Sequence, residues 1–236
     1  MTLSAPVHHL KRKAKLLSRD RDMPLHAALD HVAAEEGYNG WSLLVSKAGD
    51  AAPSAKLFPR LIDGDMVLVG ARPGQGKTRF SLELAVEAMK QGRRSHFFTL
   101  EYTVKDVVAL FDKIDEAPAR YDALFRLDSS DGIHAAYIME QLADAPRGTL
   151  AVVDYLQLLD QKRDTPPLET QIKQLKDFAA AKGIIFVFIS QIDRSFEPAS
   201  KPLPDMSDIR LPNPLDLALF SKTCFIHNGK ISFRGG

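Results

Sequence analysis

One segment of the sequence has residue types suited to holding a nucleoside triphosphate. The apolar residues 67–69 lead into a turn rich in glycine and proline, and then into an amphipathic helix. Backbone N–H groups of such a turn surround a phosphate, and the N-terminus of the following helix adds positive potential. Lys77 supplies an ammonium for phosphate oxygens, and the Thr78 hydroxyl is suited to Mg²⁺. The predicted phosphate-binding residues are Ala71, Arg72, Pro73, Gly74, Gln75, Gly76, Lys77, Thr78 and Arg79.

The first position of this phosphate loop is Ala71, where glycine is usual. We expect alanine to fit if its φ is negative, because the crowded contacts fall nearer Gly74 and Gly76. The alternative is a glycine-rich turn between a strand and a helix that holds no ligand. The strand and the helix on either side favour the nucleotide site.

Three further polar side chains stand at the ends of apolar runs that we expect to be strands. They are Asp154, Glu101 and Gln191. Because ligands of a parallel sheet bind beyond the carboxyl ends of its strands, all three are expected beside the phosphate loop. We predict that Asp154 holds Mg²⁺ there, directly or through a water molecule.

Glu101 and Gln191 each allow two interpretations. A carboxylate at Glu101 can activate the water that attacks a γ-phosphate, or it can simply begin the helix after Tyr102, where the helix dipole favours it. Spacing alone does not choose between these. The Gln191 amide can sense the γ-phosphate and signal to the following loop, or it can cap backbone groups. Taken by itself, capping is the better interpretation of Gln191.

From residue 57 onward, apolar runs alternate with helical patterns. This alternation predicts an α/β fold, with a mostly parallel twisted sheet covered by helices on both faces. The expected helices are residues 78–91, 104–114, 133–143 and 169–181. The expected strands are residues 66–69, 96–100, 123–127, 150–153, 184–189, 217–220, 224–227 and 230–233, the last two forming a hairpin around Asn228-Gly229.

The first part of the chain differs from this pattern. We expect a small N-terminal helical unit over residues 1–47, a linker over 48–56, and the α/β domain over 57–236. Trp41, Leu43 and Leu44 are expected to close the helical unit. Its first helix has a basic side, which suits either contact with nucleic-acid phosphates or simple solvation, the commoner explanation. The basic residues are Lys11, Arg12, Lys13, Lys15, Arg19 and Arg21.

Composition sets broad limits on function. The 236 residues carry a formal net charge of +1, so a nucleic-acid surface must be a local patch. The single cysteine, Cys224, cannot form an intrachain disulfide, which fits a reducing cytosol. No apolar run approaches the ~20 residues of a membrane span. We therefore expect a cytoplasmic protein without a membrane partner.

The ordered motifs resemble one family. Together they are similar to the motor domain of replicative DnaB-type hexameric helicases, which are RecA-like P-loop ATPases. The resemblance covers roughly residues 57–233. It rests on residues 71–78, Leu100-Glu101, Asp154-Tyr155-Leu156-Gln157-Leu158, Ser190-Gln191-Ile192-Asp193-Arg194 and Ser207-Asp208-Ile209-Arg210.

The resemblance implies a helicase or helicase-like protein that hydrolyses ATP with Mg²⁺ and acts on single-stranded DNA. It implies a homo-oligomer, of which a hexameric ring is one form. Glu101 becomes the general base and Gln191 the γ-phosphate sensor, with Lys77 and Thr78 on phosphate and Mg²⁺ and Asp154 as the second Mg²⁺-site residue. The implied DNA-facing cations are Arg194, Lys201 and Arg210.

The sequence departs from this family in three places. The large N-terminal helical domain is not recognisable, and the segment 210–217 is short and proline-rich. The family carries a Lys and an Arg before the hairpin Asn-Gly to reach a neighbouring subunit's γ-phosphate, where this chain has Phe225 and His227. The alternative function is therefore a slow or inactive ATPase acting as a nucleotide-gated scaffold. The candidates to replace the missing cations are Lys222, Lys230 and Arg234.

Overall fold

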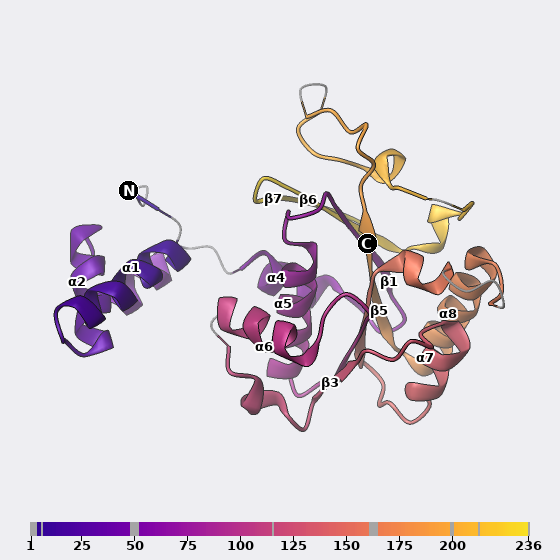
Figure 1. The fold of residues 1–236 in the computed structure, drawn as a ribbon, viewed down its shortest axis with the longest axis horizontal. Helices are drawn as coiled ribbons and strands as arrows, with labels where there is room; N and C mark the ends of the chain where they lie inside the picture. Colours follow the sequence, from indigo (N-terminus) through magenta and orange to yellow (C-terminus); the bar gives the residue numbers. More distant parts are fainter. Residues whose placement is uncertain are drawn as a thin grey trace. The chain divides into compact units, whose positions relative to one another are not determined.

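The computed structural model of the chain divides into two compact units, Met1–Ala51 and Ala52–Gly236. We call them the helical unit and the sheet unit, and Figure 1 shows the elements of each. No helix in the part of the chain that the structure describes has both the length and the apolar character needed to cross a membrane. The described residues are 4–5, 7–47, 52–114, 116–160, 165–198, 201–211 and 213–235.

The helical unit consists of α1 (Val7–Asp20), α2 (Leu25–Glu35) and α3 (Trp41–Lys47). Its core includes Leu10 of α1 and Leu44 of α3, which are almost fully buried. Leu43, which we expected to help close this unit, is 41% exposed, so that part of the prediction was wrong. Consecutive helical residues point about 100° apart, so α3 can turn only one of the two leucines inward.

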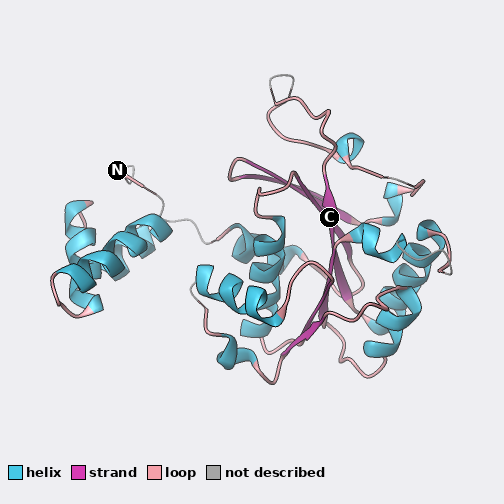
Figure 2. Cartoon of the chain, in the orientation of Figure 1, coloured by secondary structure: helices cyan, strands magenta, loops and turns pink. Residues whose placement is uncertain are grey.

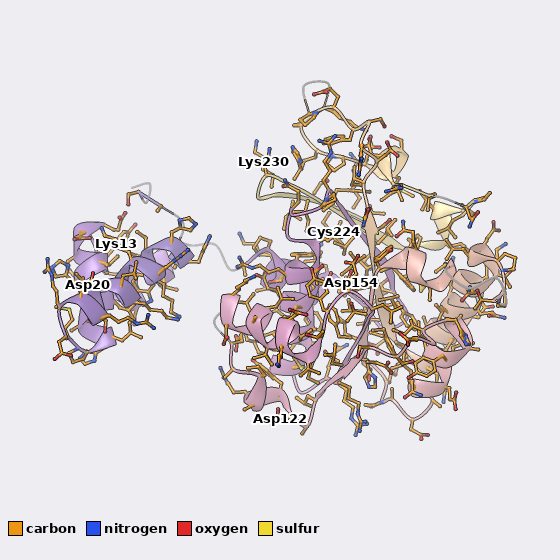
Figure 3. The ribbon with its side chains drawn as sticks, in the orientation of Figure 1. Lys13, Asp20, Asp122, Asp154, Cys224 and Lys230 are labelled. Carbon is orange, nitrogen blue, oxygen red and sulfur yellow. The ribbon has the colours of Figure 1, made fainter. Side chains whose placement is uncertain are left out.

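The basic side of α1 is partly neutralised by α2. The Lys13 ammonium lies 2.6 Å from a carboxylate oxygen of Glu35, and both side chains are exposed. Figure 3 labels Lys13 and Asp20 on this helix. An exposed pair of this kind contributes little to stability, typically ~0–1 kcal/mol.

The sheet unit contains one seven-stranded sheet in the order β3-β2-β4-β5-β1-β6-β7. All neighbouring strands are parallel except β6 and β7, which form an antiparallel hairpin. The predicted hairpin is therefore present. The strands are β1 (Met66–Ala71), β2 (Ser95–Thr99), β3 (Phe125–Asp128), β4 (Leu150–Asp154), β5 (Ile185–Gln191), β6 (Lys222–His227) and β7 (Lys230–Arg234).

Helices cover both faces of the sheet, as Figures 1 and 2 show. Helices α4, α5 and α6 lie on one face, and α7 and α8 on the other. The α-helices are α4 (Pro53–Leu57), α5 (Lys77–Lys90), α6 (Val104–Lys113), α7 (Ala135–Gln141) and α8 (Leu168–Lys182). The 3₁₀ helices are Phe58–Arg60, Pro118–Tyr121, Leu156–Asp160, Met206–Asp208 and Leu217–Leu219.

The central strands are apolar along their length because both faces of the sheet are covered. In β5, Phe186 and Phe188 pack in the core on the α8 side, whereas Val187 and Ile189 pack on the α5 side. Side chains alternate between faces along a strand, so the positions on both faces of such a strand are mostly apolar. The predicted fold class, a mostly parallel sheet with helices on both faces, is confirmed.

Two segments differ from the sequence-based expectation. Residues 217–220 are not a strand: Leu217–Leu219 form a 3₁₀ helix, because the Asp216 side chain accepts a hydrogen bond from the backbone N–H of Ala218 at 2.9 Å and starts a turn. Residues 53–56 of the expected linker belong to α4, which begins at Pro53 and buries Leu57 in the same core as α5.

A buried ion pair lies at the amino ends of β1 and β6. The Lys222 ammonium is 2.7 Å from a carboxylate oxygen of Asp65, and both side chains are nearly inaccessible to solvent. Ser221 donates a hydrogen bond to the same carboxylate at 2.8 Å. This end of the sheet is opposite to the carboxyl ends of the strands, so Lys222 is held away from the phosphate loop.

We expect Lys222→Met to destabilise the sheet unit by about 3 kcal/mol, because it leaves the Asp65 carboxylate buried without its cation. Urea denaturation measures this change. The matched control is Lys230→Met on the exposed end of the same hairpin, for which a change under about 0.5 kcal/mol is expected. Equal losses for both variants would show that the buried pair has no special role.

Candidate functional site

The phosphate loop occupies the turn between β1 and α5. Gly74 and Gly76 have φ values of 76° and 85°, in the left-handed region where other residues are strained. Gly76 is the N-cap residue of α5, so the first N–H groups of this helix open onto the loop. Ala71 is buried as the last residue of β1 and has no positive φ. The condition for alanine at this position is therefore met.

Asp154 lies at the carboxyl end of β4, fully buried in the middle of the sheet unit (Figure 3). The pKa of its carboxyl is raised to about 6, mainly by burial and also by the nearby Glu101 charge. The Thr78 hydroxyl and the positive charge of Lys77 both act in the opposite direction and lower this pKa. Four predicted site residues, from three separate segments of the chain, therefore lie close enough to interact.

The Asp154 carboxylate is suited to a cation. Neither of its oxygens accepts a hydrogen bond of normal geometry from the described residues, although the Thr78 hydroxyl is near enough to affect its pKa. A buried carboxylate without a partner is costly, and Mg²⁺ prefers oxygen ligands. Asp154 and Thr78 therefore fit the Mg²⁺ that accompanies a bound triphosphate.

Glu101 lies just beyond the end of β2 and is exposed. Its backbone N–H donates to the Thr99 hydroxyl at 3.1 Å. The helix that follows, α6, begins at Val104 and is capped reciprocally by Thr103 and Asp106. The alternative role of Glu101, starting this helix, is thus filled by other residues. Glu101 also lines an open cavity of about 660 Å³ at the ends of β2 and β3.

Gln191 is the last residue of β5 and pairs in register with Ala71 at the start of the phosphate loop. Along β5 it follows Ile189 by two residues, so its side chain lies on the α5 face of the sheet. The next residue, Ile192, donates its backbone N–H to the Ala71 carbonyl at 3.2 Å. Gln191 is thereby beside the phosphate loop, as predicted.

The three predicted DNA-facing cations lie in the segment after β5. Arg194 and Arg210 are exposed. Lys201 instead lies 3.1 Å from a carboxylate oxygen of Asp205 and 2.6 Å from one of Asp208, and these carboxylates raise its pKa. The structure therefore leaves two of the three charges open to solvent and neutralises the third locally.

Gln157 is a site residue whose contacts sequence reasoning did not identify. Its side-chain amide donates to the Ser190 hydroxyl at 3.3 Å and to the Arg210 carbonyl at 2.7 Å. It thereby joins the segment after β4 to the end of β5 and to Arg210, which follows the residue that forms a single β-bridge with Ile192. The available signal was an uncharged polar residue inside the apolar run that follows Asp154.

The β6–β7 hairpin folds against its own chain at the positions where the resemblance leads one to expect cations. Phe225 is 1% exposed and lies where any side chain on Gly70 would meet it. The His227 ring packs edge-on against Phe196, with centroids 5.3 Å apart. At the turn, the Asn228 backbone N–H donates to the Gln75 side chain of the phosphate loop at 2.7 Å.

The three candidate replacement cations lie in different places. The charge of Lys222 is already paired with the buried Asp65 carboxylate. Arg234 pairs in register with Thr223, at the amino end of β6. Lys230 pairs with His227 at the carboxyl end of β6, beside the phosphate loop, and is exposed at the hairpin tip (Figure 3). Only Lys230 of the three is placed at the nucleotide edge.

No family model matches the sequence. The sequence is similar to a probable plasmid replicative DNA helicase of Chlamydia trachomatis, 25% identical over 211 residues that span 72% of this chain and 47% of that protein. It is also 26% identical over 200 residues to the replicative DNA helicase DnaB of Helicobacter pylori, spanning 70% of this chain and 41% of that protein. The chain thus spans less than half the length of these curated relatives.

Solved structures share the fold. A DnaB-like replicative helicase, described with its interactions with primase, aligns with a TM-score of 0.59 at 18% identity, over 92% of this chain and 65% of that chain. The ATPase domain of G40P aligns with a TM-score of 0.56 at 20% identity, over 78% of this chain and 79% of that chain. The resemblance to DnaB-type helicases is confirmed, and the sheet unit has the RecA-like P-loop ATPase fold.

We expect Asp154→Asn to stabilise the free protein while weakening its hold on Mg²⁺. The folded-state pKa of about 6 exceeds the ordinary 3.8, so the folded state loses stability as pH rises through this window. Asparagine has no such penalty. The variant should be more stable by about 1–3 kcal/mol at pH 7.5, and the difference should vanish near pH 4.

Urea denaturation at both pH values, without nucleotide or Mg²⁺, measures this difference. A titration with ATP in the presence of Mg²⁺ then measures the lost affinity. Stability that is unchanged or reduced at pH 7.5 would show that the Asp154 carboxylate is not desolvated in the free protein.

Proposed function

We propose that this chain is a DnaB-like helicase or helicase-like protein, which hydrolyses ATP and acts on single-stranded DNA. The observation that carries the proposal is the convergence of Lys77, Thr78 and Glu101 on the buried Asp154 carboxylate. The similarity to replicative helicases supports the same class of activity.

Each residue has a defined task in this proposal. The loop N–H groups and the Lys77 ammonium bind the β- and γ-phosphates and stabilise the charge that develops during transfer. Mg²⁺, when bound, offsets negative charge between these phosphates. Thr78 and Asp154 would hold that ion with oxygen ligands. Glu101 accepts the proton of the attacking water, which contributes typically 10²–10⁴-fold to the rate.

The proposed DNA contact lies in the segment after β5. Arg194 and Arg210 are exposed there, and the backbone N–H of Arg210 donates to the Gln191 carbonyl at 2.9 Å. Gln191 senses the γ-phosphate on one side and positions this segment on the other. The assembled form is a homo-oligomer, with a hexameric ring as the arrangement to test.

We expect Lys77→Ala to weaken Mg²⁺–ATP binding and Glu101→Gln to retain binding while lowering turnover at least about 100-fold. Both are measured with the full chain, by nucleotide titration and by ATP hydrolysis with and without an oligo-dT strand. The control is Glu140→Gln, an exposed carboxylate on α7 that is distant in sequence from the site residues. Turnover stimulated by oligo-dT that survives both site substitutions would contradict the proposal.

A second candidate function is a slow, nucleotide-gated binding protein. It is favoured by the burial of Phe225 and His227, neither of which presents a cation to a neighbouring subunit. A trans-acting cation is worth about 10³–10⁵ in turnover in related phosphate-loop enzymes, so its absence would leave hydrolysis slow.

Lys230→Met distinguishes the two candidates. If Lys230 supplies the missing charge in a ring, DNA-stimulated turnover should fall at least about tenfold in this variant. Size-exclusion chromatography with ATP, Mg²⁺ and oligo-dT should still show the ring. Arg234→Met, at the other end of the same strand, should have no such effect. A persistent monomer with slow turnover that neither substitution changes would favour the gated binding protein.

A further inference from the structure

Arg72 of the phosphate loop binds another segment of the protein with its side chain. Its Nη2 atom donates to the Arg194 carbonyl at 2.9 Å and also to the Phe196 carbonyl. The guanidinium carbon lies 5.4 Å from the centroid of the Phe196 ring. One side chain thus fixes two backbone carbonyls and one ring of the segment after β5.

Phe196 is the centre of this contact. It is 2% exposed, although it lies in a loop between exposed residues. Besides Arg72, its ring meets the His227 ring of the hairpin and lies 5.9 Å from the Lys201 ammonium. A buried phenylalanine at this position holds the phosphate loop, the hairpin and the segment after β5 to one another.

Two further hydrogen bonds of residues 193–196 lie within the segment after β5. Asp193 donates its backbone N–H to the Asp208 carbonyl at 2.7 Å, and Ser195 donates its backbone N–H to the Asp193 carboxylate at 2.8 Å. These hydrogen bonds shape residues 193–196 but do not extend to the phosphate loop. Among the contacts of the described residues, the Arg72 side chain makes this connection. The N–H groups of its Nη2 atom serve both carbonyls while the planar guanidinium lies over the Phe196 ring, and a lysine has no planar group to place there.

We propose that Arg72 is a positioning residue that transmits nucleotide occupancy from the phosphate loop to residues 193–197. Its backbone belongs to the loop that closes around the phosphates, and its side chain holds the segment carrying Arg194. Ordering of the loop by a triphosphate therefore orders that segment. This role goes beyond the phosphate binding that the loop sequence predicts, and its DNA consequence rests on the proposed function.

The test is amide hydrogen exchange of the full chain, with and without Mg²⁺ and the non-hydrolysable analogue adenylyl imidodiphosphate. Exchange at residues 76–80 reports occupancy of the nucleotide site, and exchange at 193–197 reports transmission. We expect the analogue to slow exchange at both places in the unmodified chain, by at least about threefold at 193–197. Arg72→Ala is compared with the unmodified chain at analogue concentrations that give equal protection at 76–80, and its protection at 193–197 should then be lost.

The matched control is Arg60→Ala. Arg60 also stacks on an aromatic ring of the sheet unit, 4.4 Å from the centroid of Phe233, but it does not belong to the phosphate loop. It should keep both protections. Should Arg72→Ala fail to bind the analogue, Arg72→Lys is decisive, because it keeps the charge but has a shorter side chain without the planar group that lies over the Phe196 ring. It should lose at least half of the protection at 193–197, and full retention there would overturn the proposal.

A second measurement separates this role from the proposed DNA function. The affinity for oligo-dT is measured with and without the analogue. The ratio of the affinity with the analogue to the affinity without it is expected to be about 5–10 in the unmodified chain and in Arg60→Ala. In Arg72→Ala this ratio should be near 1. If the analogue slows exchange at 193–197 in the unmodified chain but this chain does not bind oligo-dT, the DNA function is refuted and the role of Arg72 stands. A chain that binds the analogue without any protection at 193–197 would overturn the Arg72 role.

Discussion

The site depends on one unfavourable interaction, the burial of the Asp154 charge without a full set of hydrogen-bond donors. The parallel sheet creates this situation, because covering β4 on both faces removes water from the strand's carboxyl end. Burial raises the pKa of the carboxyl to about 6, and the Glu101 charge adds to the effect. In the proposed function, a divalent cation bound with a triphosphate would relieve both. Under that proposal, ligand binding would remove a cost that the free protein carries at one desolvated side chain.

The same geometry explains which parts of the site are readable from the sequence. Apolar runs ending in Asp154 and Gln191 predict their position correctly, because a parallel sheet brings strand ends to one edge whatever the loops do. The Glu101 ambiguity needed the structure: only the reciprocal cap between Thr103 and Asp106 shows that α6 starts without Glu101. The 3₁₀ helix at 217–219 was missed because a four-residue apolar run does not distinguish a strand from a capped turn.

Contacts made by loop side chains were not predictable in the same way. Gln157 and Arg72 stand in recognisable motifs, but their partners are mostly backbone carbonyls of segments that are distant in sequence. A carbonyl exists at every residue, so no residue type marks the acceptor. The ion pair between Lys222 and Asp65 was not predictable for a similar reason, since it follows from the parallel register of β6 beside β1. Spacing along the hairpin gave three candidate cations, and only the direction of each strand separates them.

The hairpin and the segment after β5 are best understood as one assembly attached to the phosphate loop at two points. Gln75 accepts the Asn228 N–H, and Arg72 holds the carbonyls around Phe196, whose ring also packs on His227. A cationic side chain at His227 would have to leave this packing to reach another subunit. The histidine instead strengthens contacts within the chain. At this position the chain therefore has a side chain that packs against Phe196 within the same chain, where the resemblance implies a charge directed at another subunit.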